Sequence, residues 1–221
     1  MENGQIKISQ TITYQNTSQD TLHSIYLNDW NNSYSNKKTP LAKRLADEYV
    51  NDFHLANDEE RGYSEIISIK QNNQDLVYQQ LKDQIDVIKV NLVSPLKPNE
   101  AYTIMLQYTV KIPSNKFTNY GMTPEGGANL RYWYITPAVY DDGWHYYSNK
   151  NLDDLFIPKS DIRLEIDYPI GYYLTSELDI DETSQTSNKQ KVILKGNNRI
   201  NNKLFINKIK TFETFENENL A

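Results

Sequence analysis

Hydrophobic and polar residues alternate along most of this chain with the two-residue period of half-buried β-strands. The clearest case is "AYTIMLQYTVKIP" (101–113), where every second residue is apolar: Tyr102, Ile104, Leu106, Tyr108, Val110 and Ile112. The pattern recurs in "DIRLEIDY" through Ile162, Leu164, Ile166 and Tyr168, and in "KISQTITY" through Ile8, Ile12 and Tyr14. Such strands turn one face to a core and the other to water, as antiparallel strands do.

Shorter segments between turn signals complete the predicted strand set: Leu22–Leu27, Tyr63–Lys70, Leu76–Leu81, Val87–Val93, Leu130–Ile135, Tyr172–Leu178, Lys191–Lys195 and Lys203–Ile209. Together they predict an all-β fold, an antiparallel β-sandwich or saddle-like pair of sheets. Pro95 and Pro98 are expected between two strands, because neither can donate to a ladder. The polar stretch "DETSQTSNK" (181–189) is expected to be a mobile hairpin tip.

One segment departs from the β pattern. In "KKTPLAKRLADEYVNDFHLAND" (37–58), Thr39 is a candidate N-cap and Pro40 occupies the first helical position. An apolar row then follows in steps of four residues: Leu41, Leu45, Tyr49 and Phe53. This spacing predicts one amphipathic helix around residues 40–54, inside a helical insertion at about 31–58.

The chain of 221 residues is expected to form a single β-sandwich domain over residues 1–209, with an acidic linker at 210–221. Its net charge of −6 argues against nucleic acid or an anionic membrane as partner. No apolar run is long enough to span a bilayer, and "MENGQIKISQ" does not resemble a signal peptide. The sequence therefore indicates a soluble protein, either cytoplasmic or, with its leader removed, extracytoplasmic or periplasmic.

Candidate catalytic chemistry is sparse. The three histidines, His23, His54 and His145, are far apart, and neither an H-E-x-x-H motif nor any cysteine accompanies them. There is no G-x-S-x-G elbow and no phosphate-binding glycine loop. The sequence thus predicts no catalytic residue, no metal ligand and no bound cofactor. Adjacent carboxylates at Asp141–Asp142 and Asp153–Asp154 are interpreted as turn residues. A calcium site at the Asp141/Asp142 loop is the alternative hypothesis to test.

The stretch "LRYWYITPAVYDDGWHYYSN" (130–149) is rich in aromatic residues. If its first six residues form a strand, Trp133 faces one side, Tyr132 and Tyr134 face the other, and Pro137 ends the ladder. Two interpretations stay open for the aromatic side chains. They pin long loops to the sandwich, or they form the wall of a cleft or interface, where Tyr and Trp are favoured.

A series of segments, taken in order, carries a family resemblance: "ITYQNTSQDTLHSIYLNDW", "DVIKVNLVSPLKPNEAYTIMLQYTVKIP", "YITPAVYDDGW" and "SDIRLEIDYPIGYYLTSEL". The series resembles the N-terminal β-domain of aminopeptidase-N-like zinc metallopeptidases (gluzincins), the family of leukotriene A4 hydrolase. The amino-acid sequence of the segment "DWNNSYSNKKTPLAKR" is most similar to a bacteroidete-type branch of this family.

The resemblance implies that the zinc ligands and the catalytic glutamate belong to a catalytic domain that is missing here. This chain alone would not be an enzyme and would bind no cofactor. It would pack on its own C-terminal catalytic domain and shape the cleft for a peptide substrate. The cleft wall implied by position consists of Tyr134, Thr136, Tyr140, Asp141 and Trp144. Thr136 stands where the family has Glu or Gln.

Two other functions remain open. A stand-alone β-sandwich module would bind carbohydrate or protein through the Tyr/Trp loop, using the aromatic rings as a stacking platform. A structural or assembly domain of the cell envelope would need no binding site at all.

Overall fold

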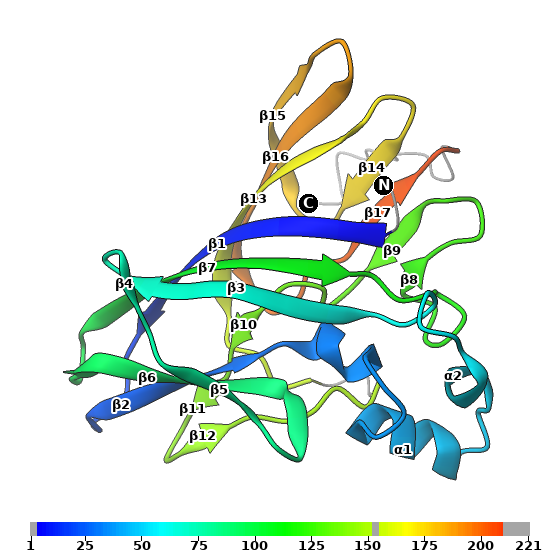
Figure 1. Cartoon of the computed structure of the whole chain (residues 1–221). Coiled ribbons are helices and arrows are strands. Elements are labelled where there is room, and N and C mark those ends of the chain that lie inside the picture. Colours follow the sequence, from blue (N-terminus) through cyan, green and yellow to red (C-terminus); the bar gives the residue numbers. More distant parts are fainter. Residues whose placement is uncertain (1–3, 152–154, 210–221) are drawn as a thin grey trace, which may run out of the picture.

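The computed structural model describes residues 4–151 and 155–209, and antiparallel β-sheets make up most of it (Figure 1). This confirms the predicted all-β fold. The predicted linker at 210–221 and the carboxylates of Asp153 and Asp154 lie outside the described residues.

Sheet A contains the longest alternating strands, in the order β1-β7-β3-β4. Its strands are β1 (Gln5–Gln15), β7 (Ala101–Lys111), β3 (Tyr63–Gln71) and β4 (Gln74–Asp75). β7 lies between β1 and β3 and pairs with β1 over its whole length, from Gln5↔Lys111 to Gln15↔Ala101. The apolar row of β7 is buried and its polar row is largely exposed, as the alternation predicted.

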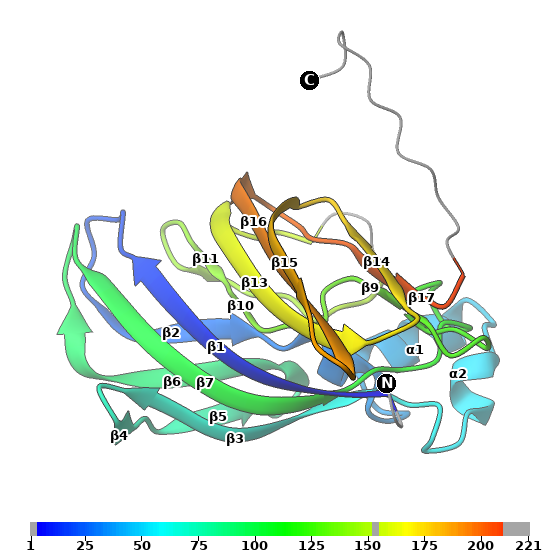
Figure 2. The ribbon, with the colours of Figure 1, turned by 90° about the horizontal axis from the view of Figure 1, so that it is seen from above.

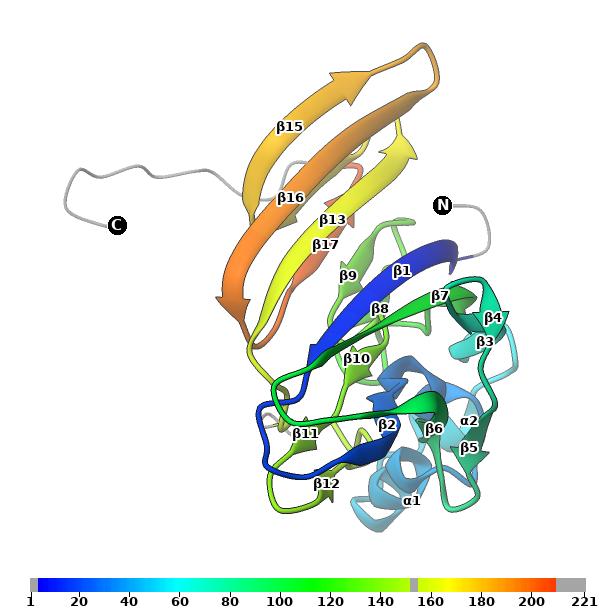
Figure 3. The ribbon, with the colours of Figure 1, turned by 90° about the vertical axis from the view of Figure 1, so that its left-hand side faces the viewer.

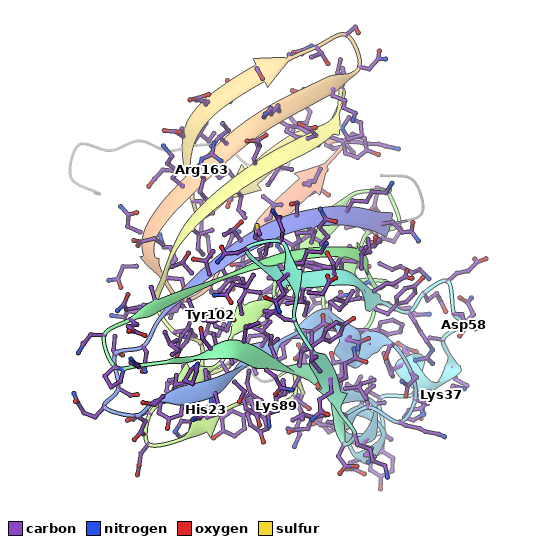
Figure 4. The ribbon with its side chains drawn as sticks, turned by 60° about the vertical axis from the view of Figure 1, so that its left-hand side comes forward. His23, Lys37, Asp58, Lys89, Tyr102 and Arg163 are labelled. Atoms are coloured by element: carbon purple, nitrogen blue, oxygen red, sulfur yellow. The ribbon has the colours of Figure 1, made fainter. Side chains whose placement is uncertain are left out.

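Sheet B lies below sheet A in Figure 1, and residues of both sheets belong to the main core, which also includes residues of the two sheets described below. Its strands, in order, are β10 (Thr136–Pro137), β2 (Leu22–Asn28), β6 (Gln84–Leu96) and β5 (Tyr78–Leu81). Tyr102, labelled in Figure 4, is a buried residue of this core, whereas Arg163 projects from a different sheet.

Pro95 lies inside β6, so the prediction that it would separate two strands is wrong. The pairing between β2 and β6 passes from Ser24↔Asn91 to Leu22↔Leu96. Residues 92–95 therefore form a bulge, where no ladder hydrogen bond is required of a proline.

Two further sheets of four and three strands complete the main β-structure of the described residues. Sheet C contains β14 (Tyr173–Ser176), β17 (Leu204–Asn207), β9 (Ala128–Leu130) and β8 (Gly121–Met122). Sheet D contains β13 (Ser160–Pro169), β16 (Lys189–Arg199) and β15 (Asp179–Gln185). Sheet D lies beside β1 when the molecule is seen from above (Figure 2), and its strands curve away from sheet A (Figure 3).

The polar stretch at 181–189 is mostly strand rather than a loop. β15 continues to Gln185, β16 begins at Lys189, and only residues 186–188 turn. The N–H of Thr186 closes this turn by donating to the Lys189 carbonyl at 2.9 Å. β15 is an edge strand, and both of its faces are exposed to water. Such a strand needs no apolar row, so its mostly polar residues suit this position.

The helical insertion is present where it was predicted, as two α-helices instead of one. After the 3₁₀ helix η2 (Trp30–Tyr34) come α1 (Pro40–Asp47) and α2 (Asp52–Leu55). Thr39 caps α1 as expected, because its hydroxyl accepts from the Ala42 N–H at 3.1 Å. Buried side chains under the helices form a second small core: Tyr34, Leu41, Ala42, Leu45, Phe53, Ala56 and Phe117.

Tyr49 explains why the helix stops. Its φ of 60° is left-handed, its N–H donates to Ala46, and the N–H of Val50 donates to Leu45. This pair of hydrogen bonds is the Schellman arrangement that ends helices. Tyr49 is consequently 88% exposed and does not join the apolar row. Neither helix of the described residues has the length and apolarity that crossing a membrane would require.

Candidate functional site

The aromatic segment at 130–149 begins as a strand but leaves it at once. β9 ends at Leu130, and Tyr132 has a left-handed φ of 54°. The predicted strand over Leu130–Ile135 is therefore wrong after its first residue. Pro137 is the last residue of β10 and pairs with Leu27, so it ends a short ladder with β2 and not the predicted strand; the next N–H, of Ala138, still donates to Tyr26.

The irregular stretch is anchored to sheet A through Ile135. The Ile135 N–H donates to the Tyr108 hydroxyl at 3.0 Å, and the Ile135 carbonyl accepts from Gln10 Nε2 at 2.7 Å. The Tyr108 hydroxyl in turn donates to Gln10 Oε1 at 2.6 Å. Both backbone groups of Ile135 are thus satisfied by side chains instead of by a neighbouring strand.

A short hairpin carries the next part of the segment. β11 (Val139–Tyr140) pairs with β12 (Trp144–His145), and Asp141 and Asp142 form its exposed tip. The Asp141 N–H donates to the Gly143 carbonyl at 2.9 Å, and the Asp141 carbonyl accepts from His145 Nε2 at 2.8 Å. The tip is therefore held by its own backbone, with both carboxylates in water.

Aromatic rings attach this hairpin to the sandwich. The Trp144 ring lies 5.6 Å from the rings of Tyr14 and Tyr26 and 5.2 Å from that of Tyr140. Tyr26 also stacks on Tyr146, with ring centroids 4.5 Å apart and planes at 6°. Contacts of this kind add to the apolar area that each ring buries. For Trp144, the geometry favours the interpretation that these aromatics pin a loop.

A buried carboxyl group anchors the end of the segment. Asp86, at the start of β6, is fully buried and accepts from Ser148 Oγ and from the Asn149 N–H, both at 2.7 Å. Desolvation raises the pKa of Asp86 to about 6, although both hydrogen bonds favour its charged form. Trp30 Nε1 adds a bond to the Tyr147 carbonyl at 2.8 Å. The hairpin is thus fixed on both sides.

The five predicted wall residues lie in two places. Tyr134 and Thr136 flank the Ile135 anchor, whereas Tyr140, Asp141 and Trp144 belong to the hairpin or its tip. Asp141 is exposed and the other four are half-buried. The Thr136 hydroxyl oxygen is buried and has no hydrogen-bond partner among the described residues. Burial also raises the pKa of Tyr134 to about 12. Only the Tyr140 and Trp144 rings are brought into contact within the hairpin group.

Gln10 and Asp86 were not identified from the sequence, although each leaves a signal there. Gln10 interrupts the inward row of β1 between Ile8 and Ile12, and Asp86 begins the apolar run "DVIKV". A polar residue at an inward position must find a partner or destabilise the fold. These two find theirs in the aromatic segment.

Metal ligands do not gather in the described residues: no group of three or more His, Cys, Asp or Glu side chains there could hold an ion. Asp141 and Asp142 accordingly gain no third ligand of these types within residues 4–151 and 155–209. His54 Nε2 is bonded to the Ala42 carbonyl at 3.0 Å, inside the helical insertion.

No family model matches this sequence, and no curated protein matches it. Solved structures do. The chain is similar to the M1 zinc metallopeptidase from Deinococcus radiodurans, with 11% identity over 92% of this chain, 38% of that chain and a TM-score of 0.51. It is also similar to a mutant two-domain M1 zinc metallopeptidase bound to L-tryptophan, with 10% identity, 90% and 38% coverage and a TM-score of 0.52. This chain therefore spans little more than a third of the matched structures, and the likeness is one of fold.

Proposed function

We propose that this chain is the non-catalytic N-terminal domain of an aminopeptidase-like zinc metallopeptidase. The observation that carries the proposal is the shared fold, which covers 92% of this chain and 38% of the Deinococcus enzyme. In this proposal residues 1–209 form one domain and residues 210–221 link it to a catalytic domain, on which it packs. The resemblance of the sequence segments supports the finer assignment to the leukotriene A4 hydrolase family and its bacteroidete-type branch.

Zinc belongs to the catalytic domain in this proposal. The support from this chain is the dispersal of its histidines and carboxylates, which form no ligand cluster in the described residues. The expected result is that the isolated chain binds zinc weakly or not at all in isothermal titration calorimetry. Tight binding of one zinc ion per chain would contradict the division of labour proposed here.

The role of this domain is to shape the cleft for a peptide substrate through Tyr134, Thr136, Tyr140, Asp141 and Trp144. A free peptide amine needs a negative partner, and Thr136 cannot supply one, since its hydroxyl is neutral and turned inward. Asp141 carries an exposed carboxylate at the hairpin tip and is the better candidate. We therefore assign recognition of the amine to the hairpin tip, while Tyr134 and Thr136 form part of the cleft wall.

The test is peptide turnover by the full-length protein with each of the five positions changed to Ala. A lower kcat/KM is expected, and Asp141→Ala should raise KM most for substrates with a free amino terminus. Asp75→Ala is the matched control, because Asp75 is an exposed carboxylate on β4, away from the hairpin. Unchanged kinetics in all five variants would remove the cleft wall from the proposal. Saturable glycan binding by this chain, followed by Trp fluorescence, would favour the stand-alone module instead.

A further inference from the structure

Gln10 is an amide in a row of apolar side chains. Its neighbours on the inward face of β1 are Ile8 and Ile12, and it pairs across the ladder with Leu106 of β7. Gln10 is half-buried, and an amide at such a position loses part of its water and needs hydrogen bonds inside the protein. Both groups of the Gln10 amide are bonded: its oxygen accepts from the Tyr108 hydroxyl of β7, and its nitrogen donates to the Ile135 carbonyl of the aromatic segment.

The three hydrogen bonds close a ring. Tyr108 is 1% exposed and its hydroxyl accepts from the Ile135 N–H while donating to Gln10. Ile135 is fully buried. The side chains of Gln10 and Tyr108 therefore give the Ile135 backbone the hydrogen bonds that a neighbouring strand would otherwise supply. Desolvation also raises the pKa of the Tyr108 hydroxyl well above its usual range, which keeps it protonated as a donor.

The ring matters because few ladder pairs hold the backbone of this stretch, although its side chains pack well: Trp133 and Ile135 belong to the main core, and the Tyr132 ring lies 5.0 Å from that of Trp30. Residues 131–135 are irregular, and β10 pairs with β2 at only Thr136↔Asn28 and Pro137↔Leu27. Ile135 stands between Tyr134 and Thr136, so the orientation of both depends on how its backbone is held. A shift of about 1 Å in such a wall is enough to change substrate binding strongly.

We propose that Gln10 and Tyr108 are positioning residues for the Tyr134–Thr136 wall. The inference rests on the proposed function, since it assigns these two residues a role at the same site. They act on substrate through the backbone of Ile135 and touch no substrate themselves. The consequence is that sheet A, which lies behind the wall, determines how tightly peptide binds.

The experiment compares Tyr108→Phe and Gln10→Leu with Tyr102→Phe in the full-length protein. Tyr102 is a matched control, because it lies on the same strand, is 3% exposed, and its hydroxyl accepts from a backbone N–H, that of Val93, at 3.2 Å. Two quantities are measured for each variant: hydrogen exchange of the Ile135 amide, and kcat and KM for peptide turnover.

Tyr108→Phe should speed exchange at Ile135 on the order of tenfold, because it removes the acceptor of that amide. KM should rise severalfold with kcat little changed, and Gln10→Leu should give the same split. Tyr102→Phe should leave both quantities as in the parent. The inference is overturned if Tyr108→Phe and Tyr102→Phe behave alike in exchange and in KM. If the unsubstituted protein turns over no peptide, the proposed function fails, while the exchange at Ile135 still decides whether the ring positions the wall.

Discussion

The backbone N–H of Asp29 donates to the carbonyl oxygen of Asp86 at 2.8 Å, which brings together two buried carboxyl side chains at the end of β2 and the start of β6. Burial raises the pKa of Asp29 from 3.8 to about 8, and the nearby Asp86 acts in the same direction. Asp29 is therefore mainly neutral at pH 7. The two residues also support η2 and the far end of the aromatic segment, so their protonation is linked to that region.

Stability should fall as the pH rises toward 8. For a carboxyl group whose folded pKa lies above its unfolded value, the folded state binds more protons over the interval between them. The stability contributed by neutral Asp29 is then fully present below about pH 4 and is lost as the pH rises through about 8. The measurement is Tm against pH from 5 to 9. Asp29→Asn keeps the shape without the titration, and should flatten the wild-type decline.

Asp86→Asn provides the contrast. Asp86 accepts two hydrogen bonds, and an amide would turn its NH2 toward the Asn149 or Ser148 donor. This change should lower the free energy of unfolding by about 1–3 kcal/mol at neutral pH. If Asp29→Asn proves as destabilising as Asp86→Asn at pH 7, Asp29 is charged there and the pH assignment is wrong.

Tyr49→Gly should stabilise the protein. Tyr49 has a φ of 60° and is 88% exposed, so its side chain makes the left-handed backbone costly while burying almost nothing. The expected gain is about 1 kcal/mol in the free energy of unfolding, measured by urea titration. Leu55→Ala, at an exposed helical position without backbone strain, should change it by less than about 0.5 kcal/mol. A loss of stability in Tyr49→Gly would indicate that the ring has contacts of its own.

The helix prediction shows what periodicity can and cannot supply. The four-residue spacing correctly placed Leu41, Leu45 and Phe53 in a small core. It could not show that Tyr49 leaves the row, because the decision is made by two local hydrogen bonds that end the helix. Backbone hydrogen bonding of this type carries no hydrophobic signature.

The strands likewise fall into those that alternation predicts and those that it cannot predict. β1, β7 and β13 were predicted from alternation, because each has one face toward a core over many residues. The strands β8 and β10 have two residues each, too few for a period. The residues that anchor the candidate site are harder to predict, because Tyr108 and Gln10 are 98 residues apart in the sequence. The signal in the sequence is Gln10 itself, a polar residue in an apolar row, and this signal does not reveal its partners.

Arg44 should protect the chain against cleavage near Lys150. Its guanidinium, on α1, donates to the carbonyls of Lys150 and Asn151, the latter at 2.9 Å. In Arg44→Met these carbonyls lose their donors, so cleavage after Lys150 by trypsin should become severalfold faster, because proteolysis follows local opening. Lys43→Met removes a positive charge from the same helix and should leave the rate unchanged. Equal rates in both variants would mean that the helical insertion does not brace this stretch.

Trp144 distinguishes the two interpretations of the aromatic segment. Its ring contacts those of Tyr14, Tyr26 and Tyr140, so Trp144→Ala should lower the free energy of unfolding by about 2–4 kcal/mol. Asp141→Ala, at the exposed tip of the same hairpin, should change it by less than about 0.5 kcal/mol while raising KM for peptide. Urea unfolding and peptide kinetics of both variants separate support of the hairpin from contact with substrate. A Trp144→Ala variant that unfolds like the parent but no longer turns over peptide would make Trp144 a recognition residue, and the pinning interpretation would then be wrong for the ring at its centre.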